Sequence, residues 1–235
     1  MTAPRSNWLA NAMSADALRR FPQSIAGQAV FAVGLSLMVN GGIGLPSWER
    51  LHRDGRDVHQ GLSYNLGITI GQAAQLSGLF VILLWIPIRQ APGLGTISNI
   101  VVIGFVMDLT LNALRLAGVP DKEVLSQNVP VAVALTIVGT ALVGLGSGIY
   151  IGSGNGPGPR DGLMTGFHRL TGRPIWIVRT IIEVAVGVVG IALGGTFGFG
   201  TIWFALTIGP QVQFWLARID PTGRAKQQSL SSSRR

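Results

Sequence analysis

Residues 129–151, VPVAVALTIVGTALVGLGSGIYI, contain no charged side chain and are apolar almost throughout. An α-helix of about 20 mostly apolar residues is long enough to cross a hydrocarbon core of roughly 30 Å. Buried strands would instead appear as runs of about 4–8 residues separated by turn signals, and such signals are missing here. The stretch therefore predicts a membrane-spanning helix.

Five further stretches have the same character. Only 12% of the 235 residues are charged, against roughly 25% in soluble domains. The 33 glycines suit membrane helices, whose backbones approach closely at small residues. We therefore predict an all-α integral membrane protein of about six transmembrane helices. The other five spans are expected at about 25–45, 62–87, 96–116, 175–196 and, somewhat short, 200–217.

The segments outside the spans define the expected organisation. Residues 1–24 form an N-terminal segment without a cleaved signal peptide, 25–217 a single transmembrane domain, and 218–235 a polar tail that we expect to be disordered. Six spans place both tails on one side, which then carries twelve Lys and Arg against five on the other. Because cytoplasmic loops collect Lys and Arg, both termini are predicted to be cytoplasmic.

Composition also restricts chemistry and partners. The absence of cysteine excludes disulfides, thiolate catalysis and cysteine-held metals. His52, His59 and His168 lie in predicted loops without metal-ligand spacing, so neither a metal nor a cofactor is expected. The net charge of +8 favours anionic lipid headgroups, not nucleic acid. With no H-E-x-x-H motif and no serine paired with histidine inside the spans, we expect no enzyme.

The two halves of the chain resemble each other. GLGTI at 93–97 returns as GFGTI at 198–202, and Ile103-Gly104 matches Ile208-Gly209 at the same spacing of 105 residues. The sequence GGIGLP at 41–46 also resembles GNGPGP at 154–159, although at a different spacing. We therefore predict a duplicated unit, with halves at about 25–117 and 129–217.

Three spans per half is an odd number, so the second copy must enter the membrane from the opposite side. The sequence thus predicts two inverted three-helix repeats. In secondary transporters, Gly- and Pro-interrupted segments of such repeats meet near the bilayer midplane and form the binding site. The alternative is that duplication is only a stable way to build a bundle.

The loop after the span at 129–151 is the first candidate site. Its prolines remove hydrogen-bond donors and its glycines weaken a helix, so it cannot remain helical. Its amides and a cation could hold an anion, with an aspartate capping the short helix that follows. The alternative is a cytoplasmic turn whose arginine contacts lipid phosphates. The candidate residues are Gly154, Gly156, Gly158, Pro159, Arg160 and Asp161.

Three charged residues inside predicted spans form the second candidate site. Arg179 and Glu183 are four residues apart and should pair on one helix face. Asp108 is predicted near mid-membrane with no cation one turn away, and Arg179 is its best candidate partner. Such residues commonly mark pathways or proton relays. The alternatives are a structural ion pair and a carboxyl held by Asn112.

Uncharged polar and aromatic residues receive structural interpretations. Asn40, Gln72, Gln75 and Asn99 are expected to bridge helices by hydrogen bonds more often than to line a cavity. The tryptophans near span ends are expected to be interfacial anchors. Those anchors are Trp48, Trp85, Trp176, Trp203 and Trp215. Separately, Gly187, Gly190 and Gly194 form a small-residue face that is expected to make an internal or a homodimer contact.

The run GSGNGPGPRDGLM at 152–164, the Arg179–Glu183 pair, GGTFGFGT at 194–201 and IGP at 208–210 resemble the YczE/YyaS/YitT family. That resemblance implies a bacterial cytoplasmic-membrane protein with five or six spans, and it implies no particular chemistry. Two functions fit these observations. One is a small secondary transporter or permease for an anionic or zwitterionic solute, and the other is a non-transporting scaffold or regulator of a partner complex.

Overall fold

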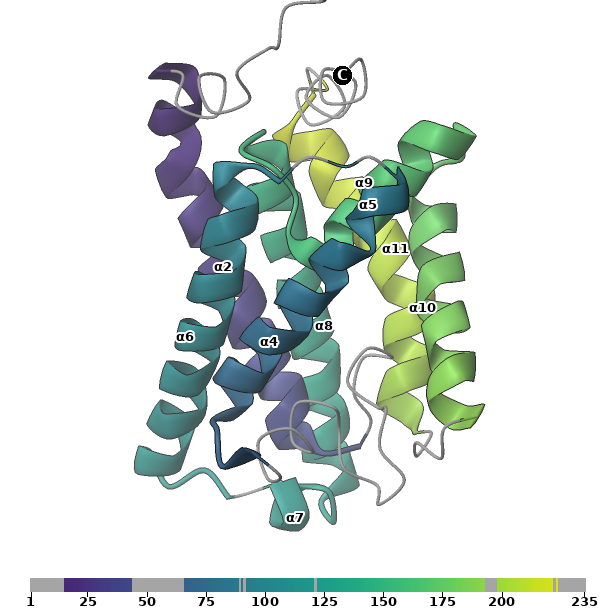
Figure 1. The fold of residues 1–235 in the computed structure, drawn as a ribbon. Coiled ribbons are helices and arrows are strands. Elements are labelled where there is room, and N and C mark those ends of the chain that lie inside the picture. The colour runs from purple at the N-terminus through teal and green to yellow at the C-terminus, as the bar shows by residue number, and fades with distance from the viewer. Residues whose placement is uncertain are drawn as a thin grey trace, which may run out of the picture.

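The computed structural model describes residues 15–43, 66–88, 90, 92–120, 122–192, 198–221 and 223. Within these ranges the chain is helical and contains no strand (Figure 1). The helices are α2 (Ala15–Gly41), α4 (Ile70–Leu83), α5 (Trp85–Ile88), α6 (Leu94–Leu116), α7 (Lys122–Leu125), α8 (Val129–Gly152), α9 (Pro159–Thr171), α10 (Ile175–Ala192) and α11 (Phe199–Ile219).

Most predicted spans agree with these helices, with two exceptions. Helix α2 begins ten residues before the predicted position. The predicted second span, 62–87, is wrong as a single helix because α4 begins only at Ile70, where Thr69 caps it, and ends at Leu83. Pro87 has no amide hydrogen to donate to the Leu83 carbonyl four residues earlier. The helix is therefore interrupted, and α5 follows as a separate short helix. Among the described helices, α2, α6 and α8 are long and apolar enough to cross a membrane.

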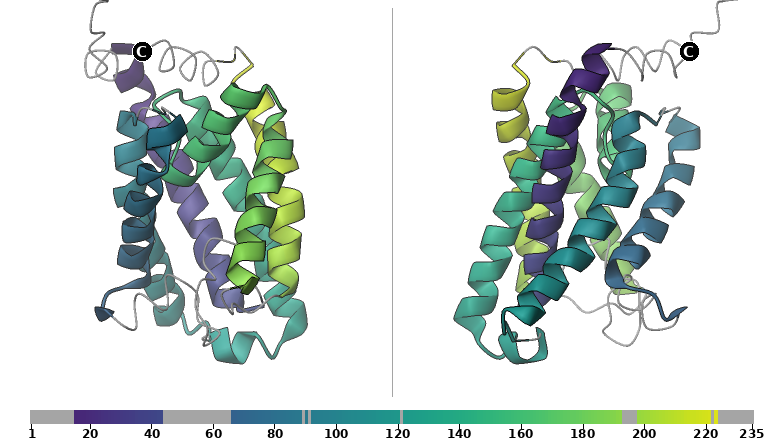
Figure 2. Two further views of the ribbon diagram at one scale, coloured as in Figure 1. Left: turned by 45° about the vertical axis from the view of Figure 1, so that its right-hand side comes forward. Right: turned by 90° about the vertical axis from the view of Figure 1, so that its left-hand side faces the viewer.

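The long helices alternate in direction. Helices α2, α6 and α10 run one way through the bundle, and α4, α8 and α11 run the other way (Figures 1 and 2). The first residues of α2 and the last residues of α11 therefore lie at the same end of the bundle. The core is built mainly by α2 and α8 with residues from the helices around them, including Phe31, Leu35, Met38, Met107, Val143, Tyr150, Met164 and Ile208.

Helices α2 and α8 pack backbone against backbone through glycines. A methyl group on Gly34 would lie 2.6 Å from the carbonyl oxygen of Gly139, and one on Gly146 would lie 2.7 Å from that of Gly27. No larger residue fits at these contacts unless the helices separate. These two contacts are related by a shift of 112 residues. Gly27 then corresponds to Gly139 and Gly34 to Gly146, so each contact maps onto the other.

A second set of contacts repeats at a spacing of 105 residues. A methyl group on Gly104 of α6 would lie 2.6 Å from the Gly71 carbonyl oxygen of α4. One on Gly209 of α11 would lie 2.7 Å from the Trp176 carbonyl oxygen of α10. The α4–α6 packing thus recurs as α10–α11 packing, in the numbering that the matching GLGTI and GFGTI motifs predict.

The starts of α6 and α11 also have equivalent surroundings. The amide of Gly95 donates to the Asn155 carbonyl at 2.8 Å, and the amide of Gly200 donates to the Ile43 carbonyl at 3.3 Å. Each acceptor directly follows a glycine with positive φ, Gly42 (71°) or Gly154 (73°). Gly42 and Gly154 are 112 residues apart, whereas the predicted match of 41–46 with 154–159 has a spacing of 113. Residues 44–46 of that match lie outside the described residues.

Candidate functional site

Residues 153–171 form a hairpin inside the bundle. The chain leaves α8 at Gly152 and turns back between the helices, and α9 then returns to the end of the bundle at which α8 stops (Figure 1). Ser153 and Asn155 are only 1% and 2% exposed. This part of the loop is therefore buried in protein, whereas the alternative of a cytoplasmic turn whose Arg160 contacts lipid phosphates stays a prediction.

The backbone of this hairpin is hydrogen-bonded by neighbouring helices. The Asn155 carbonyl accepts from the Gly95 amide, and the Pro157 carbonyl accepts from the Thr96 hydroxyl at 2.7 Å. The Pro159 carbonyl accepts from the indole nitrogen of Trp85 at 2.8 Å. Irregular backbone at membrane depth is tolerated where protein satisfies its polar groups in this way.

Glycines allow the hairpin to approach its neighbours. Gly156 has a φ of 110°, which other residues rarely adopt. A methyl group on Gly162 would lie 1.9 Å from the Trp85 ring, so only glycine fits there. Trp85 itself is 1% exposed, and the prediction that it is an interfacial anchor is wrong because α5 turns its ring onto the start of α9.

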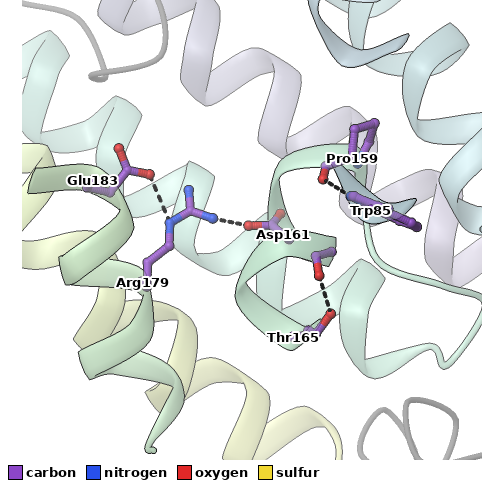
Figure 3. Close-up of polar contacts among 7 residues, drawn as sticks. Trp85, Pro159, Asp161, Thr165, Arg179 and Glu183 are labelled. Carbon is purple, nitrogen blue, oxygen red and sulfur yellow. Dashed lines mark hydrogen bonds and ion pairs between the residues drawn. The ribbon is translucent and has the colours of Figure 1, made fainter. Parts of the chain in front are cut away.

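Three charged side chains meet where the hairpin contacts α10. Arg179 donates from Nη1 to the Asp161 carboxylate, and its Nε lies 3.0 Å from Oε1 of Glu183 (Figure 3). Asp161, Arg179 and Glu183 are 2%, 3% and 0% exposed. We call these three residues the charge cluster. The predicted Arg179–Glu183 pair is confirmed, and the hairpin adds a second carboxylate to the same guanidinium.

The structure corrects the predicted role of Asp161. Gly158 occupies the N-cap position of α9 and has no side chain to accept a hydrogen bond there. Asp161 lies in the first turn of α9, and its carboxylate is directed at Arg179 and not at the helix amides. It therefore connects the hairpin to α10.

Asp108 is not part of the charge cluster. Its carboxylate accepts hydrogen bonds from the Thr69 hydroxyl and from the Gly71 amide, the latter at 2.9 Å. It thus stabilises the start of α4, and the predicted pairing with Arg179 is wrong because Arg179 is held by Asp161 and Glu183. Gln213 accepts from the Trp176 amide at 3.3 Å at the equivalent place on α11.

A small cavity of about 40 Å³ lies next to the charge cluster. Residues of α2, α4, α6 and α8 and the start of α9 form its walls, and the lining residues with polar or charged side-chain groups are Asn99, Tyr150, Arg160 and Asp161. The neighbouring candidates Gly158 and Pro159 also line it, whereas Gly154 and Gly156 shape the loop behind it. The structure therefore brings the loop candidates and the charged residues of α10 together, and leaves Asp108 apart.

The other polar candidates mostly have structural roles. Gln75 of α4 donates to the Val101 carbonyl of α6 at 3.2 Å, which confirms the predicted bridging of helices. Gln72 completes the cap of α4, and Asn40 donates to the Pro120 carbonyl. Asn99 differs, because it lines the cavity. The sequence named Asn99 and Trp85 but not their roles here, and it did not point to Gly162, because each role depends on contacts between distant segments.

Some predictions fall outside the described residues. They concern the loop with His52 and His59, the anchor Trp48, Gly194 and most of the tail after residue 217. Among the residues that are described, no group of three or more His, Asp or Glu side chains could hold a metal ion.

Comparisons with known proteins identify relatives of this chain. Residues 18–217 match a family described as "Family of unknown function (DUF6198)". An uncharacterized protein of Haemophilus influenzae is 31% identical over 213 residues, covering 91% of this chain and 90% of that protein. The uncharacterized membrane protein YczE of Bacillus subtilis is 29% identical over 206 residues, covering 87% and 88%. No solved structure matches.

Proposed function

Because this chain belongs to the YczE-like family DUF6198 and is a membrane protein, we propose that it is a small secondary transporter or channel-like permease. It works without enzymatic activity in the bacterial cytoplasmic membrane, with both termini in the cytoplasm and with anionic headgroups around its basic loops. The solute is anionic or zwitterionic.

The proposed architecture is an inverted repeat of two three-helix units. In it, α2, α4 with α5, and α6 form one unit, and α8, α10 and α11 form the other. Two observations support it. The α2–α8 contacts exchange at a spacing of 112 residues, and the α4–α6 contacts recur in α10–α11 at a spacing of 105. The units start at opposite ends of the bundle, as inversion requires (Figure 2).

The observation that carries the proposal is the charge cluster beside the cavity. An ionisable side chain in a membrane span costs at least ~2.5–3.5 kcal/mol on insertion scales, and such residues commonly line pathways. Here two of them, both on α10, meet Asp161 of the hairpin that interrupts the bundle between α8 and α10, and interrupted segments of this kind form the sites of inverted-repeat transporters. Arg160 and the start of α9 suit the anionic part of a solute, and the Asp161 carboxylate suits a cationic part.

Alternating access follows from the way the units meet. The α2–α8 crossing brings backbone against backbone at four glycines, and we propose that the two units rock about this crossing while the core side chains around it repack. Such a motion would open the cavity to one side of the bundle and then to the other.

Flux measurements test this function. Purified protein is reconstituted in liposomes, and uptake of radiolabelled acetate, as an anion, and glycine, as a zwitterion, is measured. We expect wild-type uptake of at least one of them, and a loss of about tenfold or more, equivalent to about 1.4 kcal/mol, in Asp161→Asn and in Glu183→Gln.

The matched control is Asp108→Asn, which also neutralises a carboxylate between helices but lies on α6, binds the start of α4 and does not line the cavity. Its uptake should stay close to that of the wild type. Equal uptake by all three variants would remove the charge cluster from the pathway.

A scaffold or regulator of a partner complex is the second candidate, and it is favoured by the small volume of the cavity and by the complete burial of the charge cluster. Under this alternative, folded wild-type protein shows no more uptake of either solute than empty liposomes, and it purifies with one stoichiometric partner.

A further inference from the structure

Asn99 carries a buried hydrogen-bond donor that the protein does not satisfy. The residue is 5% exposed and lines the cavity. Its Nδ2 has no hydrogen-bond partner among the described residues. Leaving a buried donor unpaired costs about 1–3 kcal/mol, so an unpaired donor in a cavity wall indicates a molecule that accepts from it.

The start of α9 lies directly beside this donor. The N-cap residue Gly158 contributes no side chain to the first turn of this 13-residue helix. Backbone amides in a first turn have no helical acceptor and carry a partial positive charge, which favours anions. A methyl group on Gly158 would lie 2.6 Å from Oδ1 and 2.8 Å from Nδ2 of Asn99, so glycine allows the Asn99 amide group to pack against the helix start.

The charges around the cavity balance one another. Arg160 and Asp161 line it, and Asp161 accepts from Arg179, which is also paired with Glu183. Two cations and two carboxylates sum to zero, so the preference for an anion rests on the Asn99 donor and on the start of α9.

The remaining walls are apolar and the space is small. Phe31 and Leu35 of α2 and Ile100 and Ile103 of α6 form most of the surface opposite the polar lining. A volume of about 40 Å³ is room for about three water-sized groups. Sulfate and phosphate are larger, and apolar walls cannot replace the hydration of a second charge.

These observations point to a short-chain monocarboxylate, and we propose that the cavity binds formate or acetate. The carboxylate lies at Asn99 and the start of α9, and the hydrogen or methyl end lies against α2 and α6. This inference rests on the proposed function and names the solute class of the same site.

The test is a binding measurement on the purified full-length protein in nanodiscs, by calorimetric titration with sodium acetate, sodium formate and, for comparison, sodium sulfate. The wild type should bind acetate and formate saturably and bind sulfate at least about tenfold more weakly. Asn99→Leu, which removes the donor, and Asn99→Asp, which keeps the size and adds a negative charge, should each weaken acetate binding about tenfold or more.

Asn112→Leu is the matched control, because it is the same substitution on the same helix at an exposed position outside the cavity. It should bind acetate as the wild type does. If Asn99→Leu fails to fold, Asn99→Asp decides the question.

Absence of saturable acetate binding in the wild type overturns the inference, and so does unchanged binding in Asn99→Asp. The outcome is distinguishable from that of the flux experiment. Acetate binding without uptake of either solute would leave this site in place and remove the transporter. Glycine uptake without acetate binding would remove this site and leave the transporter in place.

Discussion

Replacing Arg179 with leucine should lower the free energy of unfolding by about 3–5 kcal/mol, because the change removes a guanidinium that is ion-paired with two buried carboxylates. This is a large part of the roughly 5–15 kcal/mol that holds a typical protein folded. We expect little folded protein after membrane extraction, and a sharply lower melting temperature for what remains, measured by fluorescence-detected size-exclusion chromatography after heating.

Two comparisons make this result specific. Arg115→Leu removes an exposed arginine near the end of α6 and should change the melting temperature little. The triple variant Asp161→Leu, Arg179→Leu, Glu183→Leu should recover much of the lost stability, because an apolar replacement of a whole buried ionic group is often neutral. The triple variant should still lack uptake. An Arg179→Leu variant that melts like the wild type would show that Arg179 does not hold these carboxylates.

Replacing Gly34 with alanine should also destabilise the protein strongly. The added methyl would lie 2.6 Å from the Gly139 carbonyl oxygen and 2.8 Å from the Val143 amide nitrogen, and backbone atoms cannot move aside unless α2 and α8 separate. Overpacking of this kind typically costs 1–3 kcal/mol and occasionally more, and we expect about 3 kcal/mol here. Gly146→Ala should behave alike, since it occupies the equivalent contact.

Gly78→Ala is the matched comparison. Its methyl would meet its nearest neighbour, the Pro159 ring, at 3.5 Å, which is ordinary contact. Alanine is favoured over glycine in a helix by up to about 1 kcal/mol, so Gly78→Ala should be neutral or stabilising in the same melting experiment. A Gly34→Ala variant as stable as Gly78→Ala would contradict the close crossing of α2 and α8.

The helices that the sequence predicted well are those with long uninterrupted apolar runs. Helices α6, α8 and α11 begin and end within about two residues of the predicted spans, and boundaries of this kind are uncertain by that much in any case. The second span failed because Thr69 and Pro87 act locally, as a cap and as a break, within a run that is apolar overall. Hydropathy averages over such single residues.

The site was predictable only in part, for a different physical reason. The pairing of Arg179 with Glu183 follows from a spacing within one helix. The pairing of Arg179 with Asp161 depends on how deeply the hairpin enters the bundle, and this depth cannot be predicted from the spacing of residues along the chain. Asp108 was misplaced likewise, because its surroundings depend on where the neighbouring helix α4 begins.

Residues 153–171 enter the bundle and bring Asp161 to Arg179. The chain has no cysteine, so a single introduced thiol can be followed without background. The most direct test is the rate at which a hydrophilic maleimide labels Ser153→Cys in detergent-solubilised folded protein, compared with Thr171→Cys at the exposed end of α9.

Ser153 is 1% exposed, so we predict that Ser153→Cys is labelled at least about tenfold more slowly than Thr171→Cys, and that the difference disappears on unfolding. Equal rates in the folded protein would show that the loop lies at the surface, which contradicts a hairpin that enters the bundle.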